Sequence, residues 1–141
     1  MNAKDYLKQY EHAARKAARC RKEYEQEMIR IDAVRSLSDN DGMPHGSGIS
    51  KPTEDKAIRL AAKAIEWKNA ELDAIETRQR IFGVISEIPG IEGDVLFAKY
   101  IELMRWERIA EALHYSTQGI YRVHGRALQL VNEKLQECSE V

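Results

Sequence analysis

The residues best suited to chemistry lie in a short stretch near the C-terminal end of this 141-residue chain. Ser116 can begin a helix, because a serine hydroxyl accepts a hydrogen bond from backbone N–H groups of the first helical turn. Four side chains that hydrogen-bond or stack follow it: Thr117, Gln118, Tyr121 and Arg122. Arginine pairs with guanine, and glutamine with adenine, through two hydrogen bonds each. The stretch therefore predicts a helix whose first turns read base edges through these four side chains.

Three residues of the same region are suited to phosphate rather than to bases. Arg126 follows Arg122 by one helical turn, where it would meet the DNA backbone, and Arg105 and Ser116 would fix phosphates beside it. Between Ser116 and Leu128 there are two arginines and no acidic residue, which gives a local charge of +2. Packing of this helix against protein alone, with its arginines solvated, is the competing interpretation. For Tyr121, packing and base stacking are equally good interpretations.

A second basic run lies near the N-terminus, where residues 13–22 hold five basic side chains and no acidic one. Arg15, Arg19 and Lys22 share one side of a helix by their spacing. They are candidates for secondary phosphate contacts, each of which would add affinity and salt dependence. The alternative is a solvated face opposite acidic groups of a returning helix, which is the commoner outcome for such runs.

Two short helices joined by a turn are predicted to position the C-terminal cluster. The apolar residues recur at the spacing that presses two such helices together: Ile109, Ala110, Leu113, Ile120 and Val123. This pattern is typical of a helix-turn-helix, which places its second helix in the major groove of DNA. His114 stands in the turn, at a position that often needs a positive φ and that glycine accepts more readily than histidine.

The rest of the chain predicts long helices and no strand. Residues 1–35 predict a long amphipathic helix, and the spacing of its apolar residues indicates a coiled-coil-like seam: Leu7, Tyr10, Ala14, Ala17, Tyr24, Met28 and Ile31. Residues 36–52 carry turn and linker chemistry and predict a flexible loop. Residues 53–88 predict a second long helix, with Thr53 as its N-cap. Its seam is expected at Ile58, Ala61, Ile65, Leu72, Ile75 and Phe82, with Lys68 and Gln79 at the skipped positions.

These elements predict an all-α protein, in which a long antiparallel helical hairpin precedes a helix-turn-helix domain over residues 94–138. Asp94 is expected to cap the first helix of that domain. The chain has no apolar run of the roughly 20 residues that span a bilayer and no apolar leader, so we expect a cytoplasmic protein that inserts in no membrane. The hairpin alone buries little surface, so a partner chain or the C-terminal domain should cover part of it.

The segment from Tyr100 to Leu128 resembles region 4 of bacterial sigma factors. The match comprises Tyr100, Ile101, Glu107, Ile109, Ala110, Leu113, Ser116, Ile120, Arg126, Ala127 and Leu128. It resembles still more closely phage and prophage proteins of Gram-positive bacteria in which Trp-Glu-x-Ile-Ala and Tyr-Arg-x-His-Gly-Arg-Ala-Leu recur. Those proteins are grouped with late-gene transcriptional regulators of the RinA and ArpU type. Over about residues 94–135, the resemblance implies a sequence-specific regulator that places helix 116–128 in the major groove of double-stranded DNA.

The charge balance limits this expectation. The whole chain has a formal net charge of −1, and residues 94–141 hold six basic and seven acidic side chains. Because DNA-binding domains are usually more basic, this unit should bind weakly unless two copies act together. We therefore expect a homo-oligomer, a dimer formed through the hairpin. Two alternatives stay open: a small terminase-like packaging subunit that forms a ring, and an adaptor that contacts RNA polymerase through the region 4-like unit.

No pattern predicts catalysis. The four histidines have no ligand spacing, and no serine or cysteine stands in a nucleophile motif. Cys20 and Cys138 lie near opposite ends of the chain, which favours free thiols over a metal site. His124 follows the apolar Val123 and is expected to be a structural histidine with a hydrogen-bond partner. We expect a protein that is not an enzyme and that uses neither a metal nor a cofactor.

Overall fold

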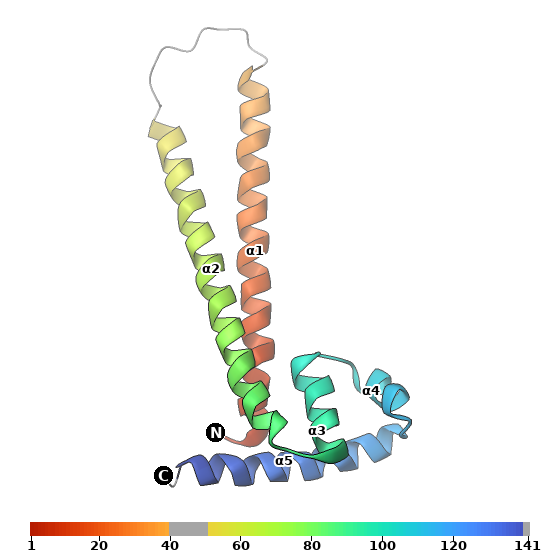
Figure 1. Ribbon diagram of the computed structural model, residues 1–141. Coiled ribbons are helices and arrows are strands. Elements are labelled where there is room, and N and C mark those ends of the chain that lie inside the picture. The colour runs from red at the N-terminus through yellow and green to blue at the C-terminus, as the bar shows by residue number, and fades with distance from the viewer. Residues whose placement is uncertain (40–50, 140–141) are drawn as a thin grey trace. The chain divides into compact units, whose positions relative to one another are not determined.

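The computed structural model describes residues 1–39 and 51–139, and these two ranges are almost entirely helical (Figure 1). No strand occurs within them, which confirms the all-α class. The long elements are α1 (Ala3–Asp39) and α2 (Lys51–Ser86). Shorter ones follow: α3 (Gly90–Leu96), the π-helical turn η1 (Phe97–Ile101) and α4 (Trp106–Leu113), and then the longer α5 (Thr117–Ser139). Each helix in the two ranges is too short or too polar to cross a lipid bilayer.

The bounds of the two long helices differ from the predicted residues 1–35 and 53–88. α1 continues to Asp39, and α2 begins at Lys51 and ends at Ser86. Thr53 therefore lies inside the first turn of α2, and its predicted role as the N-cap is wrong. Pro52 suits that first turn, because a proline there removes only an N–H that has no helical partner. Most of the predicted loop, residues 40–50, lies outside the described residues.

The chain divides into two compact units, Ala14–Leu72 and Met1–Ala13 with Asp73–Val141. This division differs from the predicted boundary near residue 94. The reason is that the unit of Met1–Ala13 and Asp73–Val141 has one shared core. The start of α1 and the end of α2 both contribute to it. The buried members of that core are Ala3, Leu7, Ile81, Ile85, Ile88, Leu96, Tyr100, Ile101, Ala127 and Val131.

Within the unit Ala14–Leu72, α1 and α2 run antiparallel (Figure 1). The Tyr24 and Trp67 rings lie 5.4 Å apart between their centroids, and Lys63 Nζ lies 3.7 Å from a carboxylate oxygen of Glu23. Positions later in α1 thus meet positions earlier in α2. The α1 seam is half-buried as predicted at Tyr24, whereas Met28 is exposed and Glu27 is buried in its place.

The α2 seam is not where the sequence predicts it. Ile58 and Ile65 of the predicted seam are 68% and 60% exposed. The helix instead buries a parallel line that contains Ala70, Ala74, Thr77, Ile81 and Ile85, and the buried Ile88 follows just beyond the end of the helix. Both lines have heptad spacing, so helical periodicity alone does not distinguish them. The buried line is richer in small residues, which let the facing helix approach closely and fill space without voids.

A tight connection leads from α2 into the C-terminal helices. Gly90 has a φ of +78°, and α3 begins there with Pro89 as its N-cap residue. The predicted N-cap Asp94 therefore lies inside α3, four residues after the helix begins. At Gly93 a Cβ atom would lie 2.1 Å from the backbone oxygen of Ile88. Only glycine allows α3 to lie this close to the backbone of the connection that precedes it.

Candidate nucleic-acid interface

α4 and α5 form a helix pair with its own small core. Val95, Ile109, Ala110, Ile120 and Val123 are buried together, and Leu113 packs against them. The predicted apolar positions of both short helices are therefore confirmed as contacts between elements. Burial of these side chains fixes the angle and the distance at which α5 leaves the turn.

The turn between the two helices has the positive φ that such turns often need, although the residue there is a histidine and not a glycine. His114 caps the end of α4 with φ 60° and ψ 41°, the left-handed region. The backbone N–H of Tyr115 donates to the carbonyl oxygen of Ala110 at 2.9 Å, and that of His114 donates to Glu111 at 3.4 Å. These bonds satisfy carbonyl groups that the helix end would otherwise leave without partners. Placing a histidine in this region costs about 1 kcal/mol relative to a right-handed conformation.

Ser116 begins α5 as predicted. Its Oγ accepts a hydrogen bond from the backbone N–H of Gly119 at 3.0 Å, the third position of the helix. The N–H groups of Thr117 and Gln118 have no helical partner, so they point out of the helix start and carry part of its positive dipole. The beginning of α5 is thus both fixed by the cap and suited to a negative partner.

The four predicted base-reading residues lie together on the first two turns of α5. Thr117, Gln118, Tyr121 and Arg122 are all exposed. Within the described part of the chain, Arg122 has no ion-pair partner, so its guanidinium is available to a ligand. Tyr121 remains 49% exposed although its ring packs against Trp106, so it both packs and presents a face to solvent.

Arg105 lies beside this surface, at the start of α4. Its backbone is extended, with φ −74° and ψ 151°, and its side chain is exposed. The next residue, Trp106, contacts Tyr121 with ring centroids 5.3 Å apart, which brings the start of α4 next to the first turns of α5. Arg105 also lines a shallow depression on α4 together with Arg108 and two glutamates. The structure therefore brings this predicted phosphate contact close to the predicted reading residues.

Arg126 has an acidic neighbour that the sequence analysis did not anticipate. Its Nε lies 3.7 Å from a carboxylate oxygen of Glu92, although the arginine side chain stays 63% exposed. Glu92 is in α3 and lies 34 positions earlier in the chain, so no helical spacing relates the two residues. A phosphate at Arg126 would compete with this carboxylate, which lowers the effective positive charge of the surface.

A buried polar pair, Tyr100 and His124, lies beneath the predicted interface. The Tyr100 hydroxyl and His124 Nε2 lie 2.7 Å apart and share a hydrogen bond, so His124 is the structural histidine that the sequence predicts. Burial, together with Lys4 and Lys99, lowers the pKa of His124 to about 4. Burial and Glu11 raise the pKa of Tyr100 to about 12. Both groups are therefore neutral near pH 7.

Trp106 connects this pair to the surface. Its ring contacts His124 edge to face at 4.6 Å on one side and Tyr121 at 5.3 Å on another, while Lys99 Nζ lies 4.7 Å from the ring centroid. These ring contacts hold Tyr121 in place, and each contributes roughly 0.5–1.5 kcal/mol. Sequence spacing did not reveal the pairing, because Tyr100 precedes His124 by 24 positions.

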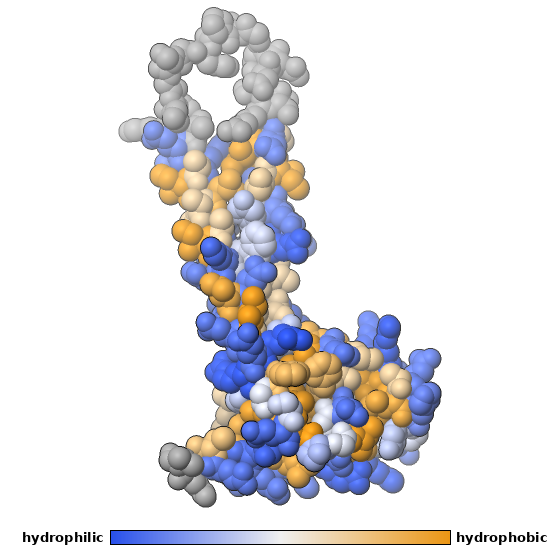
Figure 2. Space-filling model, in the orientation of Figure 1, coloured by the Kyte–Doolittle hydropathy of each residue, from blue (hydrophilic) through white to orange (hydrophobic). Residues whose placement is uncertain are grey.

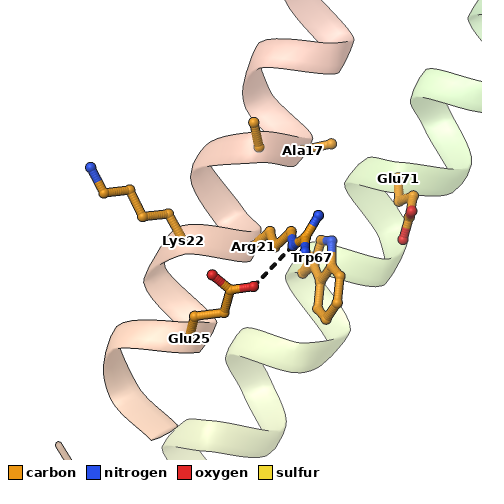
Figure 3. Close-up of a pocket in the computed structure, with 7 residues that line it drawn as sticks. Ala17, Arg21, Lys22, Glu25, Trp67 and Glu71 are labelled. Atoms are coloured by element: carbon orange, nitrogen blue, oxygen red, sulfur yellow. Dashed lines mark hydrogen bonds and ion pairs between the residues drawn. The ribbon is translucent and has the colours of Figure 1, made fainter. Parts of the chain in front are cut away.

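The predicted secondary contacts lie on α1, in the unit Ala14–Leu72. Arg15, Arg19 and Lys22 are exposed there. Their neighbour Arg21 behaves differently, because it pairs with Glu25 at 3.0 Å and lies over the Trp67 ring at 6.0 Å. Figure 3 shows Arg21 beside the indole of Trp67, whereas Lys22 extends away from it. Within this basic run, Arg21 is therefore held against α2, whereas Arg19 and Lys22 are exposed.

No group of three or more His, Cys, Asp or Glu side chains in the described ranges is arranged to hold a metal ion. Cys20 and Cys138 are free thiols. In comparisons with known proteins, the chain matches no family model, no curated protein and no solved structure.

Proposed function

We propose that this protein is a sequence-specific DNA-binding regulator of transcription, not an enzyme, and of the late-gene type found in phages and prophages. The observation that carries the proposal is the start of α5. A serine-capped helix presents Thr117, Gln118, Tyr121 and Arg122 side by side on its exposed first turns. The resemblance of residues 100–128 to sigma factor region 4 points to the same use of this helix.

In the proposed complex, the first two turns of α5 enter the major groove. Arg122 hydrogen-bonds to O6 and N7 of a guanine, Gln118 to N6 and N7 of an adenine, and Tyr121 stacks or contacts a thymine methyl group. Arg105, Ser116 and Arg126 bind phosphates and fix the orientation of the helix pair. A second copy of the chain would double this footprint, which a nearly neutral domain needs for tight binding.

One observation favours a second candidate, an adaptor that contacts RNA polymerase. The ion pair between Arg126 and Glu92 places an acidic group within the predicted phosphate surface. A surface of mixed charge suits a protein partner better than a polyanion. In that case the exposed part of α5 would bind protein, and Arg122 would act there instead of at a base.

Selection from a random double-stranded DNA library tests the first candidate. We expect a defined motif to be enriched, and Arg122→Ala to weaken binding to it about 10-fold or more, since a bidentate arginine–guanine contact contributes about 1–3 kcal/mol. Arg78→Ala is the matched control, because Arg78 is an exposed arginine on α2 outside the interface. If the selection enriched no motif, and the protein captured purified RNA polymerase in the absence of DNA, the adaptor would be favoured.

A further inference from the structure

A line of exposed apolar side chains runs along α2. Its members and their exposed fractions are Ile58 68%, Ile65 60%, Leu72 50%, Ile75 48% and Phe82 44%. The steps between them are seven, seven, three and seven residues, which are the a and d positions of a heptad. α2 is one continuous helix from Lys51 to Ser86, and a line of heptad spacing drifts around a straight helix by about 20° per heptad. Figure 2 shows hydrophobic surface along this helix, interrupted by hydrophilic side chains.

This line, which we call the outer stripe, lies apart from the buried side of α2, although Phe82 at its end also packs edge to face against Phe97, with ring centroids 5.9 Å apart. The same helix buries Ala70, Ala74 and Thr77 on another side. A helix with a single packing partner needs a single apolar stripe. A second stripe, about 36 Å long at the helical rise of about 1.5 Å per residue, marks a surface that another helix covers.

We propose that a second copy of this chain covers the outer stripe, with the two α2 helices packed antiparallel about a two-fold axis near residue 70. A two-fold contact requires that a surface match itself when its direction is reversed. The outer stripe meets this condition: reversal about residue 70 exchanges Ile58 with Phe82 and Ile65 with Ile75. Every a position then faces a d position of the second copy, as helices that pack in antiparallel pairs require.

The charges near the axis select the antiparallel arrangement. Lys68 occupies a d position of the outer stripe, and Glu71 is exposed at the edge of the stripe nearest α1, where it also lines a hollow with Arg21 and Lys22. In the antiparallel register, Lys68 of each copy lies beside Glu71 of the other, so two ion pairs flank the axis. In a parallel dimer Lys68 would face its own counterpart, and the two ammonium groups would repel each other. Neither Lys68 nor Glu71 has an ion-pair partner among the described residues.

Sedimentation equilibrium of the full chain without DNA tests the interface. We expect twice the chain mass of 16.2 kDa, and a dissociation constant that rises at least 100-fold in Ile65→Lys. Ile29→Lys is the matched control, because Ile29 is 68% exposed on α1 and lies off the outer stripe. A monomer at all concentrations, a ring, or a dimer that Ile65→Lys leaves unchanged would overturn the proposal.

Charge reversal near the axis tests the orientation. Lys68→Glu should weaken the dimer about 10-fold or more, and adding Glu71→Lys to the same chain should restore it. Both positions are exposed, so these variants keep the fold, which circular dichroism verifies. Failure of the second change to restore the dimer would refute the antiparallel register. Because these measurements contain no DNA, their outcome is independent of the proposed function.

Discussion

At the scale of single residues, the side chains of the interface are held by groups that the ligand would never touch. His124 lies beneath Trp106, Trp106 contacts Tyr121, and Tyr100 completes the hydrogen bond of the histidine. A neutral imidazole suits this position, because a buried positive charge beside Lys4 and Lys99 would be costly. The buried His124 therefore makes the free energy of unfolding depend on pH.

We expect the protein to lose stability as the pH falls from about 6.5 to 4. The pKa of His124 is lowered to about 4 in the folded chain, against 6.5 for an unperturbed histidine. Over this window the unfolded chain binds more protons than the folded chain, so acid favours unfolding. The loss due to His124 amounts to about 2–3 kcal/mol by pH 4. Urea unfolding at a series of pH values measures it.

His124→Gln provides the control for this effect, since glutamine keeps a polar group but does not titrate. The variant should be less stable than the native chain near pH 7, and its stability should change less between pH 6.5 and 4. Equal pH dependence in the two proteins would show that the carboxylates, and not His124, cause the loss.

Arg126 gives a second prediction at this scale, which rests on the proposed function. Glu92→Gln removes the carboxylate 3.7 Å from the arginine without changing the size of the side chain. DNA affinity should then rise about two- to five-fold, in line with the roughly 0.2–1 kcal/mol of an exposed ion pair. Glu133→Gln removes one exposed acid elsewhere on α5 and should have less effect. Equal gains in fluorescence anisotropy titrations would indicate a general charge effect.

At the scale of elements, the close approach of α3 to the connection between α2 and α3 depends on one glycine. A Cβ at Gly93 would meet the backbone oxygen of Ile88 at 2.1 Å, whereas nothing lies within 4 Å of one at Gly125 in α5. Backbone cannot move aside as a flexible side chain can. The two glycines therefore differ in their role although both lie in helices.

Gly93→Ala should lower the free energy of unfolding by about 2 kcal/mol or more, because α3 must move away from Ile88. Gly125→Ala should raise it by roughly 0.5–1 kcal/mol, since alanine favours an unobstructed helix interior. Chemical denaturation of both variants measures the two values. A Gly93→Ala protein as stable as the native chain would contradict the close approach.

At the scale of the whole molecule, the near-zero net charge limits how DNA is held. With a formal charge of −1, attraction must come from a few placed side chains and not from the overall field. Three predicted arginines, Arg105, Arg122 and Arg126, lie on or beside the first turns of α5. The run on α1 adds Arg15, Arg19 and Lys22 if it also touches DNA.

The salt dependence of binding distinguishes these two sets. Arg105→Ala should reduce the slope of log affinity against log salt by about 0.9 for each copy bound, because one phosphate contact is lost. Replacing Arg15, Arg19 and Lys22 together with alanine should reduce it by nearly three times as much if they are secondary contacts. An unchanged slope in the triple variant would identify them as a solvated helix face.

The sequence by itself determined the local features of this protein. The helical class, the Ser116 cap and the apolar positions of α4 and α5 all follow from residue type and spacing within a few turns. Such features depend on neighbours along the chain, whose geometry is fixed by the helix itself.

Only the tertiary structure decided which of the two α2 lines is buried, and which residues separated by many positions meet. The pairs Tyr100–His124 and Glu92–Arg126 have no signal in helical periodicity. Two lines of heptad spacing compete on α2, and burial follows the one that packs more closely against α1. Which line is buried depends on how well the whole surfaces of the packed helices fit together, and no single stretch of the chain specifies that fit.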